Sequence, residues 1–210
     1  MAFMSTPSDR RAGWLAGTAP ALGREHQYWL TRPGALTAGL QRLGRVRLRV
    51  LRERAEGLCR NEAWMLGLAP RSPIWAREIV MSINGVDSVL ARSVTPLAAS
   101  HAWWQGMRRL RSRPLADMLY ADPRISRSPF YTRRLDRWQP LYRALRAGLP
   151  EAACAAPALL ARCSVFRRGG QPLSVAECFL PGFWRLAAAY QPAGANERRH
   201  GPPFPATHQA

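Results

Sequence analysis

Charged side chains in the first of two predicted β-hairpins could bind an anion. The dipeptide Asn84-Gly85 lies between two runs of β-branched and apolar residues, and it favours a two-residue turn in which both residues take positive φ. Counting outward from this turn places Arg77 opposite Arg92. Like charges opposed on an apolar face destabilise a strand pair, and buried charge must be paired. The hairpin therefore predicts an anion site, although the pattern also fits arginines that reach past apolar neighbours to water.

The second predicted hairpin places opposite charges across from each other. Its turn is Gly169-Gly170, and counting outward places Arg162 opposite Glu177. Strand alternation puts Glu177 on the same face as leucine, valine and phenylalanine side chains. An arginine and a glutamate opposed in this way satisfy each other's charge, unlike the two arginines of the first hairpin.

Other catalytic patterns are absent from the sequence. It contains no GxGxxG run, P-loop lysine or HExxH motif, and its four cysteines lack zinc-site spacing. Outside the C-terminal tail the histidines are His26 and His101, and neither has a neighbouring Ser/Asp pattern. We therefore expect no metal and no cofactor, and a chemistry that depends on arginines, a carboxylate and an apolar cavity.

Adjacent strand pairs, tight turns and connecting helices must position these residues. The hydrophobic pattern predicts helices over 33–43, 97–110, 115–120 and 138–149, and strands over 46–50 and 125–135 besides the two hairpins, 74–95 and 159–180. Pro129 indicates an edge or a bulge in the strand over 125–135. This order predicts an α+β fold with an antiparallel sheet.

The length and composition fit one domain with flanking segments. The chain has 210 residues, 47% of them hydrophobic, which supports a sizeable core. We predict a flexible leader over 1–22, a domain over 23–185 and a disordered tail over 186–210. No apolar stretch is long enough to span a membrane, and the N-terminus lacks the apolar region of a secretory signal. We expect a cytoplasmic protein with no membrane span.

The high positive charge of the chain is only weak evidence for nucleic-acid binding. The formal net charge is +18, and every basic residue is arginine because the chain contains no lysine. The arginines are scattered over the predicted strands, helices and tails rather than gathered on one stripe. We therefore expect no nucleic-acid partner, and an arginine-rich nucleic-acid-binding protein is kept as an alternative.

Four separated segments resemble bacterial chorismate pyruvate-lyases and occur in that family's order. They are ALTAGLQRLG (35–44), WAREIVMSINGVDSVLARSVTP (75–96), RPLADMLY (113–120) and GQPLSVAECFLP (170–181). The resemblance implies an antiparallel sheet of about six strands flanked by helices, with an internal ligand cavity. It also implies conversion of chorismate to 4-hydroxybenzoate and pyruvate without a cofactor, the first step of the ubiquinone ring pathway.

The same segments imply site residues. Arg77 and Glu177 match the family's ligand-binding arginine and glutamate and are the implied catalytic residues. Leu115 matches the leucine of its PL motif, and Leu36 stands where the family usually has methionine. Arg77 would bind the ring carboxylate of chorismate. Glu177 would face the ring hydroxyl as a general base, an acid or an orienting group.

Chorismate carries a second carboxylate on its enolpyruvyl arm, so a second cation is expected. The assumed register makes Arg92 or Arg162 the candidate. We expect chorismate as the partner and a monomeric protein. A non-catalytic ligand-sensing domain of the same fold is the other alternative; in transcription regulators such domains follow a winged helix-turn-helix, and the segment before the resemblance is shorter than that domain.

Overall fold

The centre of the fold is an antiparallel sheet that confirms the predicted α+β class. The computed structural model describes residues 13–19, 21–154 and 159–190. Within them the sheet has eight strands in the order β1-β6-β7-β8-β4-β3-β2, with β5 beside β7. The strands are β1 (Leu15–Ala16), β2 (Val46–Gly57), β3 (Pro73–Ile83), β4 (Val86–Pro96), β5 (Ser126–Arg127), β6 (Tyr131–Leu135), β7 (Leu159–Arg168) and β8 (Gln171–Phe179).

The strand count exceeds the predicted six because two strands are very short. Strands β1 and β5 have two residues each, too few for a hydrophobic period to show. The expected strand over 125–135 is interrupted near Pro129, so that β5 and β6 pair separately with β7. The predicted strand over 46–50 continues to Gly57 as β2.

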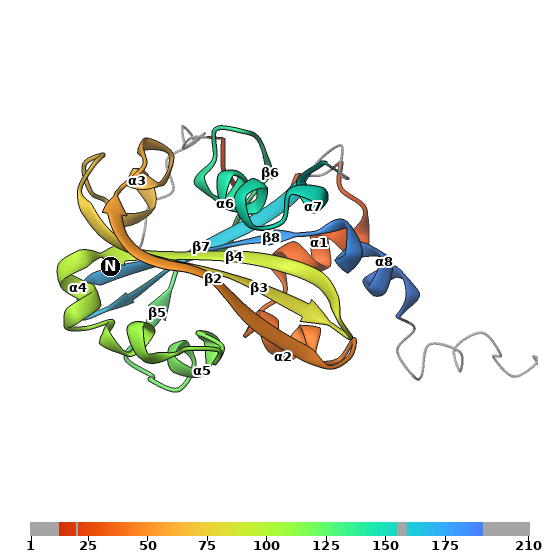
Figure 1. Ribbon diagram of the computed structural model, residues 1–210, viewed down its shortest axis with the longest axis horizontal. Coiled ribbons are helices and arrows are strands. Elements are labelled where there is room, and N and C mark those ends of the chain that lie inside the picture. The colour runs from red at the N-terminus through yellow and green to blue at the C-terminus, as the bar shows by residue number, and fades with distance from the viewer. Residues whose placement is uncertain (1–12, 20, 155–158, 191–210) are drawn as a thin grey trace, which may run out of the picture.

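Helices cover both faces of this sheet (Figure 1). Helices α3, α6 and α7 lie on one face, and α2 and α5 lie on the other. None of the described helices is long and apolar enough to cross a membrane. The helices are α1 (Arg24–Thr31), α2 (Leu36–Leu40), α3 (Arg60–Leu66), α4 (Leu97–His101), the 3-10 helix η1 (Gln105–Arg109), α5 (Ala116–Leu119), α6 (Pro140–Gly148), α7 (Pro150–Cys154) and α8 (Pro181–Ala189).

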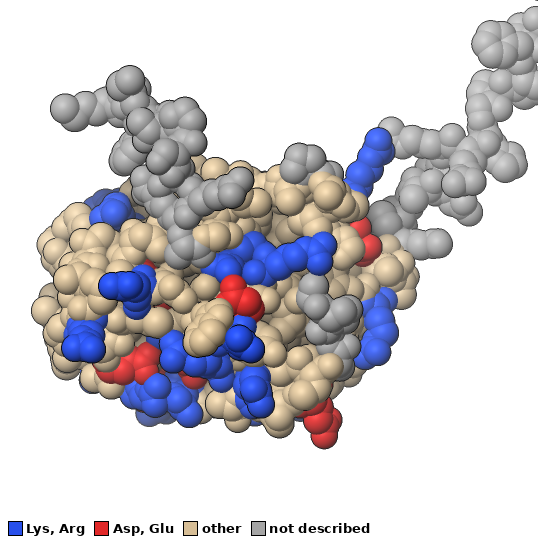
Figure 2. Space-filling model, turned by 90° about the horizontal axis from the view of Figure 1, so that it is seen from above, with Lys and Arg blue, Asp and Glu red and all other residues tan. Residues whose placement is uncertain are grey.

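Helix α6 is amphipathic: its apolar side packs on the sheet, and its opposite side is charged and exposed. Leu141, Ala144 and Leu145 are buried against the sheet, whereas Arg143 and Arg146 are exposed. Seen from this side, basic side chains are spread over the surface with a few acidic ones between them (Figure 2). Because the chain has no lysine, all of these basic groups are arginines.

The register predicted for the first hairpin is wrong beyond its turn. Asn84 and Gly85 take φ of 50° and 85° and form the expected two-residue turn. The register then shifts between Ser82 and Met81, because β4 holds one extra residue, Ser88, at a β-bulge. A shift of one residue turns every following side chain to the opposite face. Arg92 therefore lies opposite Glu78 rather than opposite Arg77.

The second hairpin keeps the predicted register. Gly169 and Gly170 have positive φ, and Arg162 lies opposite Glu177 as counted from the turn. The two hairpins pair through β4 and β8, which brings Glu177 opposite Ala91.

The predicted domain boundaries need correction at both ends. Trp14 is 2% exposed within the core, and Leu15 pairs with Thr132 of β6, so part of the predicted leader belongs to the fold. Helix α8 extends past the boundary at 185, and Ala187 is buried. The rest of the predicted tail, 191–210, lies outside the described residues, as do residues 1–12.

Candidate functional site

One face of the sheet carries two adjacent rows of residues that frame the site. Neighbouring strands place these residues opposite one another, and alternation places both rows on the same face. The first row is Ile79, Ala91, Glu177 and Arg162, and the second row is Arg77, Ser93, Val175 and Ser164.

A cavity lies over these rows, between the sheet and the segments that carry α2 and α5. Its walls are mainly apolar, and the charged residues among the described lining residues are Arg127, Arg162 and Glu177. Besides these, the lining includes Leu36, Thr37, Leu48, Ile79, Met81, Ala91, Ser93, Leu115, Leu119, Tyr120, Phe130, Ser164, Phe166 and Val175. Four predicted site residues are thus brought together: Leu36, Leu115, Arg162 and Glu177.

Arg77, on strand β3, is not among the residues that line the cavity, but it lies opposite the lining residue Ser93. It is 1% exposed and lies on the same face as the lining residues Ile79 and Met81. Its Nε donates to Glu53 at 2.7 Å, and its Nη2 donates to the carbonyl oxygen of Arg111 at 2.5 Å. Within the described part of the chain, Nη1 of Arg77 makes no hydrogen bond. That N–H group is left for a further hydrogen bond.

Glu177 is held by a buried arginine. Nε of Arg162 donates to Oε2 of Glu177 at 2.6 Å, and the glutamate side chain keeps 14% exposure beside the cavity. Nη1 of Arg162 donates to the carbonyl oxygens of Trp29 and Arg32, at the end of α1. Arg162 therefore orients the carboxylate and also ties the segment before α2 to the sheet.

The spacing of Arg77 and Glu177 suits a small ring with polar groups at opposite ends. Strands lie about 4.8 Å apart and rise about 3.3 Å per residue, so positions two strands and two residues apart are separated by about 12 Å between Cα atoms. Both side chains project over the same face. A ring that carries a carboxylate and a hydroxyl at opposite ends fits between an arginine and a glutamate at this spacing.

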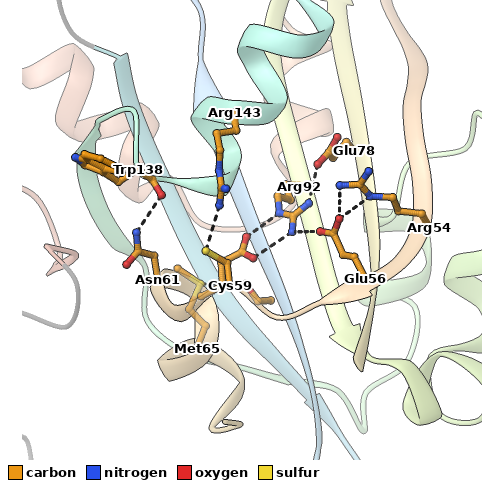
Figure 3. Close-up of polar contacts among 11 residues, drawn as sticks. Arg54, Glu56, Cys59, Asn61, Met65, Glu78, Arg92, Trp138 and Arg143 are labelled. Atoms are coloured by element: carbon orange, nitrogen blue, oxygen red, sulfur yellow. Dashed lines mark hydrogen bonds and ion pairs between the residues drawn. The ribbon is translucent and has the colours of Figure 1, made fainter. Parts of the chain in front are cut away.

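Arg92 lies on the other face of the sheet and is not among the residues that line the cavity. It is 3% exposed and donates hydrogen bonds to three carboxylates: Glu62 at 2.7 Å, Glu78 at 2.6 Å and Glu56 at 2.6 Å (Figure 3). The sequence placed it in the binding site because the bulge at Ser88 cannot be counted from a turn. Its role is to join β4 to β2, β3 and α3, and it does not enter the cavity.

The electrostatics of this cluster follow from one arginine facing three acids. Burial alone would raise the pKa of Glu56, but hydrogen bonds and charge from Arg92 and Arg54 outweigh it and lower that pKa below 4.5. Burial alone would lower the pKa of Arg92, but hydrogen bonds and charge from Glu62 and Glu56 outweigh it and raise that pKa. Both shifts favour the charged forms of Glu56 and Arg92.

Sequence reasoning missed several residues of the cavity. The hydroxyls of Ser93 and Ser164 belong to the framing rows, and Arg127, Phe130 and Tyr120 reach the cavity from outside the hairpins. Alternation from the confirmed turn of the second hairpin could have found Ser164. Arg127 had no such signal, because the pairing of β5 with β7 joins segments distant in sequence. Among the described residues, no group of three His, Cys, Asp or Glu side chains could hold a metal ion.

Comparison with known proteins gives the family. The family model described as Chorismate lyase matches residues 9–188, most of the chain. The chain belongs to the chorismate lyase family. A Bordetella pertussis protein named probable chorismate pyruvate-lyase is 58% identical over 89% of this chain and 97% of that protein. A chorismate lyase relative from Pseudomonas entomophila, named probable chorismate pyruvate-lyase 1, is 39% identical over 82% of this chain and 91% of its own length.

Among solved structures, the chain is similar to the effector domain of PhnF from Mycobacterium smegmatis. The TM-score is 0.49 at 15% identity, over 70% of this chain and 89% of that chain.

Proposed function

We propose that this chain is a chorismate pyruvate-lyase, the activity after which its family is named. In this reaction the ether bond between the ring and the enolpyruvyl group breaks. A proton leaves the ring carbon that bears the hydroxyl, and the ring becomes aromatic 4-hydroxybenzoate. The released enolpyruvate gains a proton and becomes pyruvate. Aromatisation supplies the driving force, so the protein must orient the substrate and stabilise the charge that develops on the departing group.

The observation that carries the proposal is an arginine and a glutamate in adjacent rows on the face of the sheet that holds the apolar cavity. Arg77 would bind the ring carboxylate through its available Nη1, since its other two nitrogens are held by Glu53 and Arg111. Hydrogen bonds between arginine and carboxylate are strong because both groups are charged. A preorganised arginine also avoids the cost of ordering a long side chain on binding.

Glu177 would face the hydroxyl end of the ring. Arg162 keeps its carboxylate in place, so that one oxygen is held at 2.6 Å from Nε and the group stands beside the cavity. From there it can accept the proton from the ring carbon that bears the hydroxyl, or bind the hydroxyl and fix the orientation of the ring. The apolar walls formed by Leu36, Leu115 and Phe166 exclude water, which strengthens each of these charge interactions.

The experiment that tests this function is direct. Purified protein is incubated with chorismate, 4-hydroxybenzoate is followed by absorbance, and pyruvate is measured by a coupled dehydrogenase assay. We expect the two products in equal amounts, well above the spontaneous breakdown measured without protein. Absence of both products above that background would overturn the assignment.

Neither alternative function is favoured by the comparisons, because the family model and the curated relatives point to a lyase. A nucleic-acid-binding protein would show affinity for DNA or RNA that falls steeply with salt. We further propose that the protein acts as a monomer and that it resides in the cytoplasm; the free state of its four cysteines supports the second of these proposals. Light scattering after gel filtration measures the oligomeric state.

A further inference from the structure

Chorismate leaves one of its charges without a partner in the site described above. The substrate has two carboxylates, whereas 4-hydroxybenzoate has one. Arg77 accounts for the ring carboxylate. Arg162 is already bound to Glu177 and to two backbone carbonyl oxygens, and Arg92 is enclosed by three glutamates on the other face.

Arg127 is the remaining charged residue that lines the cavity. It comes from the short strand β5, which pairs with β7 so that Arg127 lies opposite Phe166. Its Nη1 is buried and has no hydrogen-bond partner. No ion pair joins Arg127 to an acidic side chain in the described parts of the chain. A buried N–H group without a partner is costly, and more so when it carries charge.

Arg127 lies at the same end of the cavity as Glu177, where the enolpyruvyl carboxylate of chorismate is expected. Its guanidinium carbon lies 4.1 Å from the centroid of the Phe130 ring, and that of Arg162 lies 4.4 Å from the same centroid. Both guanidinium groups therefore stack near one ring, and Arg162 holds Glu177. In chorismate the ether carbon is next to the carbon that bears the hydroxyl. A ring whose hydroxyl faces Glu177 thus carries its enolpyruvyl arm at this end.

We propose that Arg127 binds the carboxylate of the enolpyruvyl group. This inference rests on the proposed function and names the residue that distinguishes the dianionic substrate from the monoanionic product. The carboxylate supplies the acceptor that Nη1 lacks, and Phe130 holds the guanidinium plane by a cation–π contact. As the ether bond breaks, negative charge moves onto the departing enolpyruvate, and Arg127 stabilises it there.

The test compares substrate and product affinity in matched variants. Arg127→Gln removes the charge and keeps a hydrogen-bonding side chain, and Arg127→Lys restores the charge. The control is Arg124→Gln, which alters an exposed arginine three positions earlier that pairs with Asp122. For each protein, the KM and kcat for chorismate, the inhibition constant of 4-hydroxybenzoate and the melting temperature are measured.

We expect Arg127→Gln to raise the KM for chorismate on the order of tenfold to a hundredfold, as loss of a buried charge partner does. The inhibition constant of 4-hydroxybenzoate should change less than about threefold, because the product lacks the second carboxylate. Arg127→Lys should recover part of the loss, and Arg124→Gln should behave like the wild type.

Two results would overturn the inference while the proposed function stands. One is an unchanged KM in a folded Arg127→Gln variant. The other is an equal loss of affinity for chorismate and for 4-hydroxybenzoate, which would indicate a general effect on the cavity. A wild-type protein that releases no 4-hydroxybenzoate or pyruvate from chorismate would instead overturn the proposed function together with this inference.

Discussion

Four buried or partly buried arginines have different surroundings, and these surroundings separate their roles. Arg77 lies on the cavity face of the sheet with one N–H group left for a further bond, and Arg127 lines the cavity with a buried N–H group that has no partner in the described parts of the chain. Arg162 holds Glu177, and Arg92 holds three glutamates. Substitutions of these residues should therefore affect binding, catalysis and stability separately.

Glu177→Gln tests the glutamate because it keeps the shape of the side chain and removes its charge and its proton. If Glu177 transfers a proton, kcat should fall by about two orders of magnitude, a typical contribution of a positioned acid or base. The inhibition constant of 4-hydroxybenzoate should change little, since an amide can still hydrogen-bond the phenol.

Steady-state kinetics and thermal melts check this prediction, because Arg162 also loses its charge partner. Glu151→Gln, on the exposed surface of α7, is the matched control. Turnover close to wild type in a folded Glu177→Gln protein would leave the glutamate with an orienting role.

Arg77→Ala should remove the anchor of the ring carboxylate. Loss of one partner of a buried charge pair costs about 2–5 kcal/mol of binding, so both chorismate and 4-hydroxybenzoate should bind far more weakly. The melting temperature should fall only modestly, because the abandoned Glu53 side chain is 26% exposed and can be hydrated.

Kinetics, product inhibition and melting curves measure these effects together. Arg49→Ala is the control, since Arg49 is exposed on β2 and pairs with Asp87 across 3.4 Å. Chorismate turnover within a few-fold of wild type would contradict the role of Arg77.

At the scale of elements, the bulge at Ser88 decides which arginine reaches which face. The extra residue in β4 sends Arg92 to the side of α3, where it joins Glu56 of β2, Glu62 of α3 and Glu78 of β3. One side chain thus connects four elements behind the cavity. The cluster holds together the strands whose opposite face carries Arg77 and Ser93.

Arg92→Met should destabilise the protein by about 3–5 kcal/mol, because it leaves buried carboxylates without a counter-charge. The effect depends on pH. Glu56 has a folded-state pKa below 4.5, so it contributes stability above that pH and loses it as pH falls through the folded pKa. In the variant Glu56 no longer has Arg92 as a partner, so its contribution is lost at neutral pH. The difference in melting temperature should therefore be largest near neutral pH and narrow as the pH falls through the pKa of Glu56.

Thermal melts over a pH series measure this difference. Arg54→Gln is the control, because Arg54 pairs with the same glutamate but its side chain is 50% exposed, and such pairs contribute about 1 kcal/mol or less. A constant difference between wild type and Arg92→Met at all pH values would contradict the charge account of this cluster.

At the scale of the whole molecule, the reactivity of the free cysteines measures how well the folded sheet excludes solvent. Cys163 and Cys178 are buried, and burial raises the pKa of both thiols. Cys154 is exposed and Cys59 is partly exposed. We expect two thiols to react quickly with a disulfide reagent in the folded protein, and the other two only in denaturant.

Absorbance of the released thiolate counts the reacting groups, and Cys154→Ser and Cys59→Ser identify the fast ones. Rapid reaction of all four thiols in the folded protein would mean that the sheet opens readily at β7 and β8.

The sequence by itself determined the features that depend on neighbouring residues. The turns at Asn84-Gly85 and Gly169-Gly170, the antiparallel hairpins and the opposition of Arg162 to Glu177 all follow from local conformational preference and strand alternation. The four family segments identified the family, which the comparisons confirm.

The tertiary structure decided everything that depends on contacts between distant segments. The bulge at Ser88 has no turn signature, so counting could not show that Arg92 faces away from the cavity. Strands of two residues are stabilised by partners far along the chain, as β5 is by β7. For that reason only the folded chain brings Arg127 beside Phe130, Arg162 and Glu177.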